Sequence, residues 1–309
     1  MTEHKKNKAI RTAAIIALSG NALLAVLKII AGVVAGSGAL LSDGIDSSAD
    51  VLIGVITLAV VKVISKPADM EHPWGHGRAE TVTTAFLSFM LFFMGAQLVI
   101  GTITKLFAKE PAAVPSSVAI IVALISIVGK SLLAWCQYFY GKRANSAMTK
   151  ANGKNMASDV LLSLGVLVGI VISTLTGSAY ADIIIGGLIG LWIIKTAVGI
   201  FLEANLELMD GNASTEPYHM IADAVNAVEG ASNPHRARMR RIAGFWDIDL
   251  DIDVDPGCTV SEAHKIASMV EAEIKSRLDD VYDIMIHIEP MGEDGDETFG
   301  LTESMMRRK

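Results

Sequence analysis

The sequence has few charged residues and only two cysteines, and these shortages argue against a soluble domain and against a disulfide-stabilised fold. Only 19% of the 309 residues are charged while 51% are hydrophobic, which is less charge than a soluble domain normally carries. The two cysteines, Cys136 and Cys258, fall in an apolar run and in the polar C-terminal part of the chain. A structural disulfide between them is therefore not expected. Internal repeats and low-complexity runs are also lacking.

The hydrophobic residues gather in six long runs, near residues 12–34, 38–64, 81–107, 117–140, 156–176 and 179–202. Each run has about the 20 residues that a helix needs to cross a bilayer. The first run is too long for a cleaved signal peptide, and no small-residue cleavage site follows it. The sequence therefore predicts an α-helical membrane protein with six transmembrane helices.

Charge divides the chain into two parts. Residues 1–207 carry 16 Lys and Arg against 12 Asp and Glu, whereas residues 208–309 carry 10 against 21. We expect a transmembrane domain over 1–207, a cytoplasmic domain over 208–292 and a disordered polar tail over 293–309. The acidic C-terminal part repels nucleic acid and attracts cations. The simpler alternative is that its charges only keep the domain soluble.

The basic residues beside the apolar runs predict the orientation of the chain, because cytoplasmic loops carry an excess of Lys and Arg. The turns near 35–38 and 174–180 contain none. Basic residues cluster instead before the first run and between the fourth and fifth, at Lys5, Lys6, Lys8, Arg11, Lys142, Arg143, Lys150 and Lys154. Both termini of a multi-pass protein are therefore expected in the cytoplasm.

The C-terminal domain shows helix and strand signals in turn. A helix is expected over about 216–229 and a short strand over 238–242. Over 246–254 apolar residues alternate strictly with Asp, which is the period of a half-buried strand. A capping-box spacing precedes an apolar helical pattern over 260–278, and residues 283–289 alternate again. We therefore predict a small α+β domain with the order α-β-β-α-β.

Two of the apolar runs contain carboxylates, which are costly at membrane depth and usually functional there. Asp46 and Asp50 are four residues apart in the second run, and Asn155 and Asp159 have the same spacing at the start of the fifth. That spacing puts each pair on one helix face, so two facing helices can surround a cation with oxygen ligands. Asp43 lies on the same stripe as a possible accessory ligand. Alternatively, Asn155 caps its helix and Asp43 lies at the membrane surface.

A second group of metal-ligand residues lies between the second and third runs. Asp69, His72 and His76 occur within eight residues, in the segment Asp-Met-Glu-His-Pro-Trp-Gly-His. Imidazole and carboxylate are the ligands that zinc-like ions prefer. A loop metal site is therefore predicted, with structural histidines as the alternative.

Together, the paired ligands, the six apolar runs and the acidic α+β domain resemble the cation diffusion facilitators, over about residues 10–292. The resemblance implies a homodimer in the cell (inner) membrane that exports divalent transition-metal ions in exchange for protons. It implies a carrier rather than an enzyme, with no cofactor beyond bound divalent metal ions such as Mn²⁺, Zn²⁺ or Fe²⁺. The transport site would be formed by Asp46, Asp50, Asn155 and Asp159, and the loop group would be a peripheral site.

The same resemblance implies a dimer-stabilising charge pair, Arg78 with Asp210, and a metal site in the cytoplasmic domain. The residues that correspond to that site are His235, Asp251, His264, His287 and Glu289. Independently of the family, His287 and Glu289 share one face of the last predicted strand. Asp249, Asp251 and Asp253 line one face of another strand, where an ordinary solvated face is the alternative for Asp249 and Asp253.

The sequence departs from the family's zinc exporters at Asn155, where those proteins usually have His. An Asp, Asp, Asn, Asp set offers only oxygen donors when the amide binds through its carbonyl. Such ligands suit manganese better than zinc, so we expect Mn²⁺ to be favoured, with Fe²⁺, Zn²⁺ and Cd²⁺ possible. Asn cannot take up a proton, which leaves proton exchange to the aspartates.

Two other functions use similar residues. An intramembrane aspartyl protease also needs two aspartates on neighbouring helices, but the doubled spacing and the loop histidines favour metal. A metal-gated channel or sensor would bind metal without coupled transport.

Overall fold

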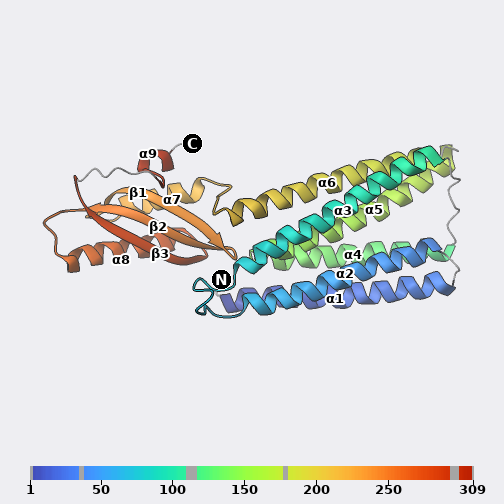
Figure 1. Cartoon of the computed structure of the whole chain (residues 1–309), viewed down its shortest axis with the longest axis horizontal. Helices are drawn as coiled ribbons and strands as arrows, with labels where there is room; N and C mark the ends of the chain where they lie inside the picture. Colours follow the sequence, from blue (N-terminus) through green and yellow to red (C-terminus); the bar gives the residue numbers. More distant parts are fainter. Residues whose placement is uncertain (1–2, 35–37, 109–116, 177–179, 293–298, 308–309) are drawn as a thin grey trace. The chain divides into compact units, whose positions relative to one another are not determined.

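The computed structural model describes residues 3–34, 38–108, 117–176, 180–292 and 299–307. The chain divides into two compact units, Thr2–Asn205 and the residues from Leu206 onward. The first unit is built from long helices and the second combines a sheet with helices (Figure 1).

In the described part of the first unit, the chain forms six helices (Figure 1). They are α1 (Glu3–Val34), α2 (Gly38–Ile64), α3 (Arg78–Ala108), α4 (Ser117–Arg143), α5 (Ala147–Thr176) and α6 (Tyr180–Leu208). Among the described residues, three spans are long and apolar enough to cross a membrane, namely Lys5–Ala31, Arg78–Thr104 and Gly187–Leu208. The membrane character of the unit is therefore supported directly, and the count of six crossings stays a prediction.

Several helices extend beyond the apolar runs that predicted them. α5 begins at Ala147 rather than near residue 156. Ser146 directly precedes the helix, and its Oγ accepts a hydrogen bond at 3.1 Å from the backbone N–H of Thr149 in the first turn. A Ser at this position satisfies one of the backbone donors that a helix start leaves unpaired. Asn155 consequently lies inside α5, so the alternative that it caps this helix is wrong.

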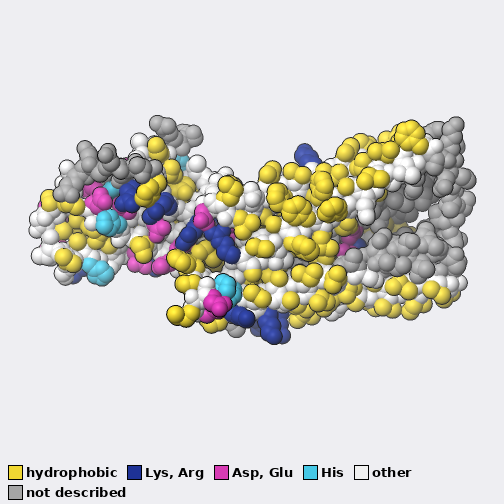
Figure 2. Space-filling view, in the orientation of Figure 1, with side chains coloured by type: hydrophobic (Ala, Val, Ile, Leu, Met, Phe, Trp, Pro, Cys, Tyr) yellow, Lys and Arg dark blue, Asp and Glu magenta, His cyan; other side chains and the backbone are white. Residues whose placement is uncertain are grey.

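The helices of the first unit pack closely where small residues meet neighbouring helices. α1 packs against α2 and α4, and α5 packs against α3 and α4. A Cβ atom added at Gly95 would lie 3.0 Å from the Gly190 carbonyl oxygen, so α3 and α6 meet through glycines. Such close approach is typical of membrane helices. Hydrophobic side chains cover much of the visible outer surface of this unit (Figure 2).

The second unit is a three-stranded sheet with helices, in the chain order α7 (Glu216–Asn226), β1 (Ser232–Ile242), β2 (Phe245–Val254), α8 (Val260–Arg277), β3 (Val281–Pro290) and α9 (Glu303–Met306). The strand order is β1-β2-β3, with β1 antiparallel and β3 parallel to β2. The predicted α-β-β-α-β order is present in the described residues. β1 is longer than predicted. Two register shifts interrupt the alternation in its first half, so the sequence pattern indicated only its second half.

Alternation in β2 separates the core from the polar face of the sheet. Ile248, Leu250 and Ile252 are fully or almost fully buried, and they belong to the same core as the apolar residues of α7 and α8. The intervening aspartates therefore lie on the opposite face. α8 begins with the predicted capping box, in which the side chains of Thr259 and Glu262 each accept from the other's backbone N–H.

The expectation of a disordered tail is wrong for residues 299–307. Leu301 forms a β-bridge with Ala237 of β1, and Thr302 caps the short helix α9. Met306 is 1% exposed and joins the core of the second unit. One buried side chain and a bridge hold a segment whose polar composition predicts disorder. Residues 293–298 and 308–309 lie outside the described residues.

Candidate metal-binding sites

The predicted transport-site residues Asp50, Asn155 and Asp159 converge inside the helical unit. Asp50 comes from α2 and the other two come from α5. The Asn155 amide nitrogen Nδ2 donates to Asp50 Oδ1 at 3.2 Å. Asp50 is 6% exposed and Asn155 7%. The i, i+4 spacing of Asn155 and Asp159 on α5 thus places both side chains near Asp50 of α2 at one buried point.

Lys130 of α4 joins this cluster, and the sequence analysis missed it. Its ammonium nitrogen Nζ lies 2.7 Å from Asp50 Oδ2 and 2.5 Å from Asp159 Oδ2. Lys130 is 7% exposed. The signal was available in the sequence, because a lysine in the middle of an apolar run is as costly as an aspartate.

Asp46 and Asp43 lie on α2, but their side chains are outside the described residues. Their part in the site therefore stays a prediction. Next to Asp46, Ser47 is 1% exposed and accepts a hydrogen bond at 2.9 Å from Lys28 of α1. A second buried lysine, from α1, thus contacts the same stretch of α2.

The predicted loop residues come together between α2 and α3. Asp69 Oδ2 lies 3.4 Å from His76 Nε2, and Asp69 Oδ1 lies 3.3 Å from His72 Nδ1. The two imidazole rings have centroids 4.4 Å apart. One ligand atom from each residue lies within 4.8 Å of the others, so the three can share one cation.

Asp69 is held as an anion by the backbone of its own loop. Its Oδ1 accepts from the backbone N–H of His72 at 2.8 Å and from that of Glu71 at 3.1 Å. These bonds, led by that of the His72 backbone, lower the pKa of the Asp69 carboxyl below 3.8. His76 Nδ1 is buried and has no hydrogen-bond partner among the described residues.

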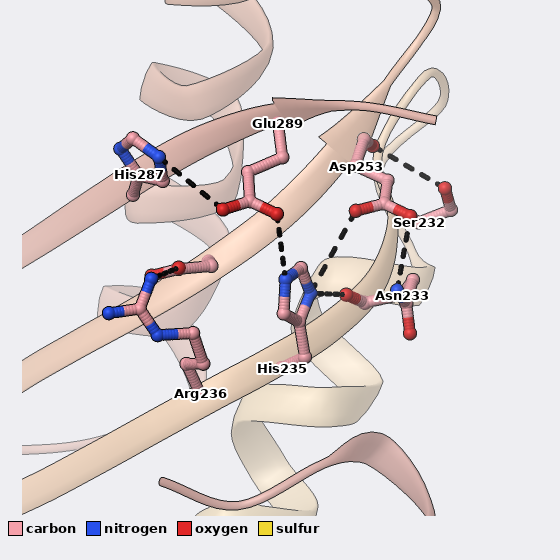
Figure 3. Close-up of polar contacts among 8 residues, drawn as sticks. Ser232, Asn233, His235, Arg236, Asp253, His287 and Glu289 are labelled. Carbon is pink, nitrogen blue, oxygen red and sulfur yellow. Dashed lines mark hydrogen bonds and ion pairs between the residues drawn. The ribbon is translucent and has the colours of Figure 1, made fainter. Parts of the chain in front are cut away.

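On the polar face of the three-stranded sheet, His235 of β1 points towards Glu289 of β3 and Asp253 of β2 (Figure 3). Register shifts on both sides of His235 and positive φ angles at Asn233 (47°) and Arg236 (45°) distort β1 here. Such bulges re-aim side chains. One ligand atom from each of His235, Asp253 and Glu289 lies within 4.8 Å of the others.

The hydrogen bonds of His235 prepare its other nitrogen for a cation. Nδ1 lies 2.6 Å from the Asn233 carbonyl oxygen, which can only accept, so Nδ1 carries the hydrogen of a neutral ring. The lone pair of Nε2 then faces Glu289 Oε2 at 3.3 Å. Two acceptors that face each other require a positive charge between them, and a metal ion or a proton supplies it.

The second group on the sheet, Asp251 with His287 and Glu289, also has ligand atoms within 4.8 Å of one another. The strand register places Asp251 opposite both His235 and His287. However, Arg236 Nη1 already donates to Asp251 Oδ2 at 2.7 Å. The guanidinium therefore competes with a metal ion for this carboxylate.

The structure does not bring every predicted residue into these groups. His264 lies on α8 and, among the described residues, belongs to neither group on the sheet. Asp249 lies 3.9 Å from Arg238 in a half-exposed ion pair, as on an ordinary solvated face. Asp253, for which that alternative was open, is 9% exposed and part of a group.

The predicted pair of Arg78 with Asp210 involves residues of different units. Arg78 begins α3 in the helical unit, whereas Asp210 follows α6 in the second unit. Within the second unit, Asp210 lies 3.9 Å from Arg240. The pairing of Arg78 with Asp210 stays a prediction.

Two family models match most of the chain. One, described as the cation efflux transmembrane domain, matches residues 14–209, and one described as the cytoplasmic domain of cation efflux protein matches residues 213–291. The chain is 30% identical to the manganese efflux system protein MneP of Bacillus subtilis over 290 residues, 92% of this chain and 97% of MneP. It is 29% identical to the cation-efflux pump FieF of Cronobacter sakazakii over 287 residues, 93% and 95% of the two chains. The solved metal-bound C-terminal domain of the CzcD transporter from Thermotoga maritima is 35% identical, covering 25% of this chain and 91% of that domain with a TM-score of 0.25.

Proposed function

The chain belongs to the cation efflux (cation diffusion facilitator) family of divalent-metal exporters, and from that premise we propose that it exports Mn²⁺ in exchange for protons. Family members are transporters, not enzymes, which excludes the intramembrane protease. We also propose that the chain crosses the inner membrane of the cell six times and that both of its termini lie in the cytoplasm.

The transport site is formed by Asp46, Asp50, Asn155 and Asp159. The observation that carries this assignment is the buried convergence of Asp50 with Asn155 and Asp159 from two helices. Uncompensated carboxylates at such a place cost several kcal/mol, and a divalent cation compensates two of them at once. The doubled i, i+4 spacing and the oxygen donors fit a site that binds a cation during its passage.

Oxygen-only ligands support manganese as the favoured metal. Asn155 offers an amide oxygen where an imidazole would favour zinc. The relative MneP, with which the chain shares 30% identity, is named a manganese efflux protein. Fe²⁺, Zn²⁺ and Cd²⁺ remain alternatives, because affinity for any one ligand set rises from manganese towards zinc.

Proton exchange follows from the charge of the site. When the metal leaves, the carboxylates of Asp46, Asp50 and Asp159 lose two compensating positive charges. The nearby Lys130 ammonium can restore one of them, and protons taken up from the outside can restore the rest. Asn155 has no proton to exchange. Alternating exposure of the site to the two sides of the membrane then couples metal export to proton entry.

The two other groups have supporting roles in this proposal. The loop residues Asp69, His72 and His76 bind a peripheral metal ion. On the cytoplasmic sheet, His235, Asp253 and Glu289 bind a regulatory ion. Asp251 and His287 bind none in the wild-type protein, because Arg236 already compensates Asp251. The family of the cytoplasmic domain supports a homodimer, with Arg78 and Asp210 as the charge pair that stabilises it.

The test is metal-driven proton movement in vesicles that contain the purified protein, across Mn²⁺, Fe²⁺, Zn²⁺, Cd²⁺ and Co²⁺. The proposal predicts proton movement with several of these ions and the highest rate with Mn²⁺. Metal flux without proton movement would favour a metal-gated channel. No response to any ion would contradict the transporter assignment for the purified protein.

A further inference from the structure

Lys130 occupies the place between the two carboxylates where a metal ion would bind. Its ammonium nitrogen donates to Asp50 Oδ2 at 2.7 Å and to Asp159 Oδ2 at 2.5 Å. The side chains of Lys130 and Asp50 are 8% and 7% exposed, and that of Asp159 is 12% exposed. The lysine comes from α4, so it joins three helices at the point where only α2 and α5 carry the predicted ligands.

We propose that Lys130 is a tethered cation that competes with the transported metal: its ammonium compensates Asp50 and Asp159 in the empty site, and the arriving divalent ion displaces it. This inference rests on the proposed assignment of the transport site. It adds a residue that sets the affinity of that site for metal.

The charges of the described groups favour exchange over joint occupancy. Asp50, Asp159 and the Lys130 ammonium carry a net charge of −1, and a divalent ion added beside the ammonium would turn this into +1. The predicted ligand Asp46 adds one negative charge and the buried Lys28 ammonium, which donates to the neighbouring Ser47, adds one positive charge, so the balance is unchanged. Replacement of the ammonium by the ion instead leaves the group neutral, which is the least costly state in a low dielectric. Withdrawal is feasible because a lysine ammonium sits on a flexible four-carbon stem.

Competition of this kind lowers the apparent affinity without changing the ligands. If the site binds metal only in the minor conformation in which Lys130 has left the carboxylates, the apparent dissociation constant equals the intrinsic one divided by the population of that conformation. Minor states commonly have populations of about 0.1–10%. Removal of the ammonium should therefore lower the dissociation constant of the transport site by about ten-fold or more.

A purely structural role for Lys130 predicts the opposite. If the ammonium only fixes the positions of the carboxylates, its removal disorders the ligands and weakens metal binding. Gln137 of the same helix provides a matched control, since it is 1% exposed and donates to the Ala13 carbonyl oxygen at 2.8 Å. Gln137→Met also removes a buried polar contact of α4, but it leaves the carboxylates untouched.

The experiment measures Mn²⁺ and Cd²⁺ binding to the full-length protein in detergent by calorimetry. The binding step that disappears in Asp159→Asn identifies the transport site among the others. We expect Lys130→Met to lower the dissociation constant of this step about ten-fold or more, while Gln137→Met leaves it at the wild-type value. An unchanged or weaker affinity in Lys130→Met would overturn the proposal.

A second measurement on the wild-type protein covers the case in which Lys130→Met does not fold. In a structure determined with Mn²⁺ or Cd²⁺ bound, the Lys130 ammonium should have left at least one of the two carboxylates. An ammonium still hydrogen-bonded to both beside the metal would overturn the competition. If Asp159→Asn loses no binding step, the site assignment itself fails, and that outcome differs from an unchanged affinity in Lys130→Met.

Discussion

Replacing Arg236 with Ala should raise the number of metal ions that the cytoplasmic sheet binds from one to two per chain. The Arg236 guanidinium donates to Asp251 Oδ2 at 2.7 Å, and Asp251 is 4% exposed. In the variant this carboxylate loses its arginine and faces His287 and Glu289, with which it forms a group of ligand size. Removal of the arginine makes the net charge around these ligands more negative by one, which favours binding of a divalent ion.

The magnitude follows from the interaction that the metal no longer has to displace. A hydrogen bond to a charged group contributes about 1.5–3 kcal/mol net, and the lower end applies because the Arg236 side chain is 30% exposed. Since about 1.4 kcal/mol corresponds to a ten-fold change in an equilibrium constant, we expect the affinity of this second position to rise about ten-fold.

Calorimetric titration of residues 206–309 with Zn²⁺ and Mn²⁺ measures the change. Arg238→Ala is the matched control, because both arginines lie over the Phe299 ring, at 5.0 and 5.3 Å, but Arg238 pairs with Asp249 instead. We expect a second metal ion per chain in Arg236→Ala and one in Arg238→Ala. One ion in both variants, with equal affinity, would refute the reasoning that Arg236 blocks a site.

Three further predictions concern the helical unit and its loop. Asn155→His should shift transport from Mn²⁺ towards Zn²⁺, measured as the ratio of initial rates in vesicles; an unchanged ratio would remove Asn155 as a selectivity residue. NMR titration of the metal-free protein should find the pKa of the Asp69 carboxyl below the ordinary Asp value. The pKa should stay low in His72→Ala, because the backbone N–H that donates to Asp69 remains. The contribution of Asp69 to loop stability is then complete above the ordinary Asp pKa and is lost only as pH falls through the lowered pKa of the folded protein. Glu80→Met should destabilise the protein by about 3 kcal/mol in detergent unfolding, because it removes a carboxylate partner of the buried Lys6 ammonium, whose nitrogen lies 3.0 Å from Glu80 Oε2. Lys6→Met combined with Glu80→Met should recover most of this loss. Equal losses in the single and double variants would argue against a coupled pair.

Local sequence patterns predicted the cytoplasmic fold well, because each pattern there has one physical cause. The alternation over 246–254 gives β2 its two faces, and Thr259 with Glu262 starts α8 at the predicted turn. Residues 299–307 were missed because Met306 and the bridge of Leu301 to Ala237 stabilise them through tertiary contacts. Composition alone does not report such contacts.

The candidate sites were predicted where ligands recur at helical or strand spacing, and missed where charge comes from another element. Asp50, Asn155 and Asp159 lie close to one another as their spacing predicts. Lys130 and Arg236 are cations that reach carboxylates from α4 and β1, and no spacing rule connects them to those carboxylates. Lys130 stands out in the sequence as a charge inside an apolar run, but assigning carboxylate partners to either cation requires knowledge of which helices and strands are neighbours.

The central claim is that the buried carboxylates of α2 and α5 carry the metal. Its most direct test is the initial rate of Mn²⁺ transport in proteoliposomes with an imposed pH gradient, compared between wild type and Asp159→Asn, with the cytoplasmic-sheet variant His235→Ala as a control for general damage. We predict that Asp159→Asn falls to the rate of protein-free vesicles while His235→Ala still transports. Transport by Asp159→Asn at the wild-type rate would contradict the account.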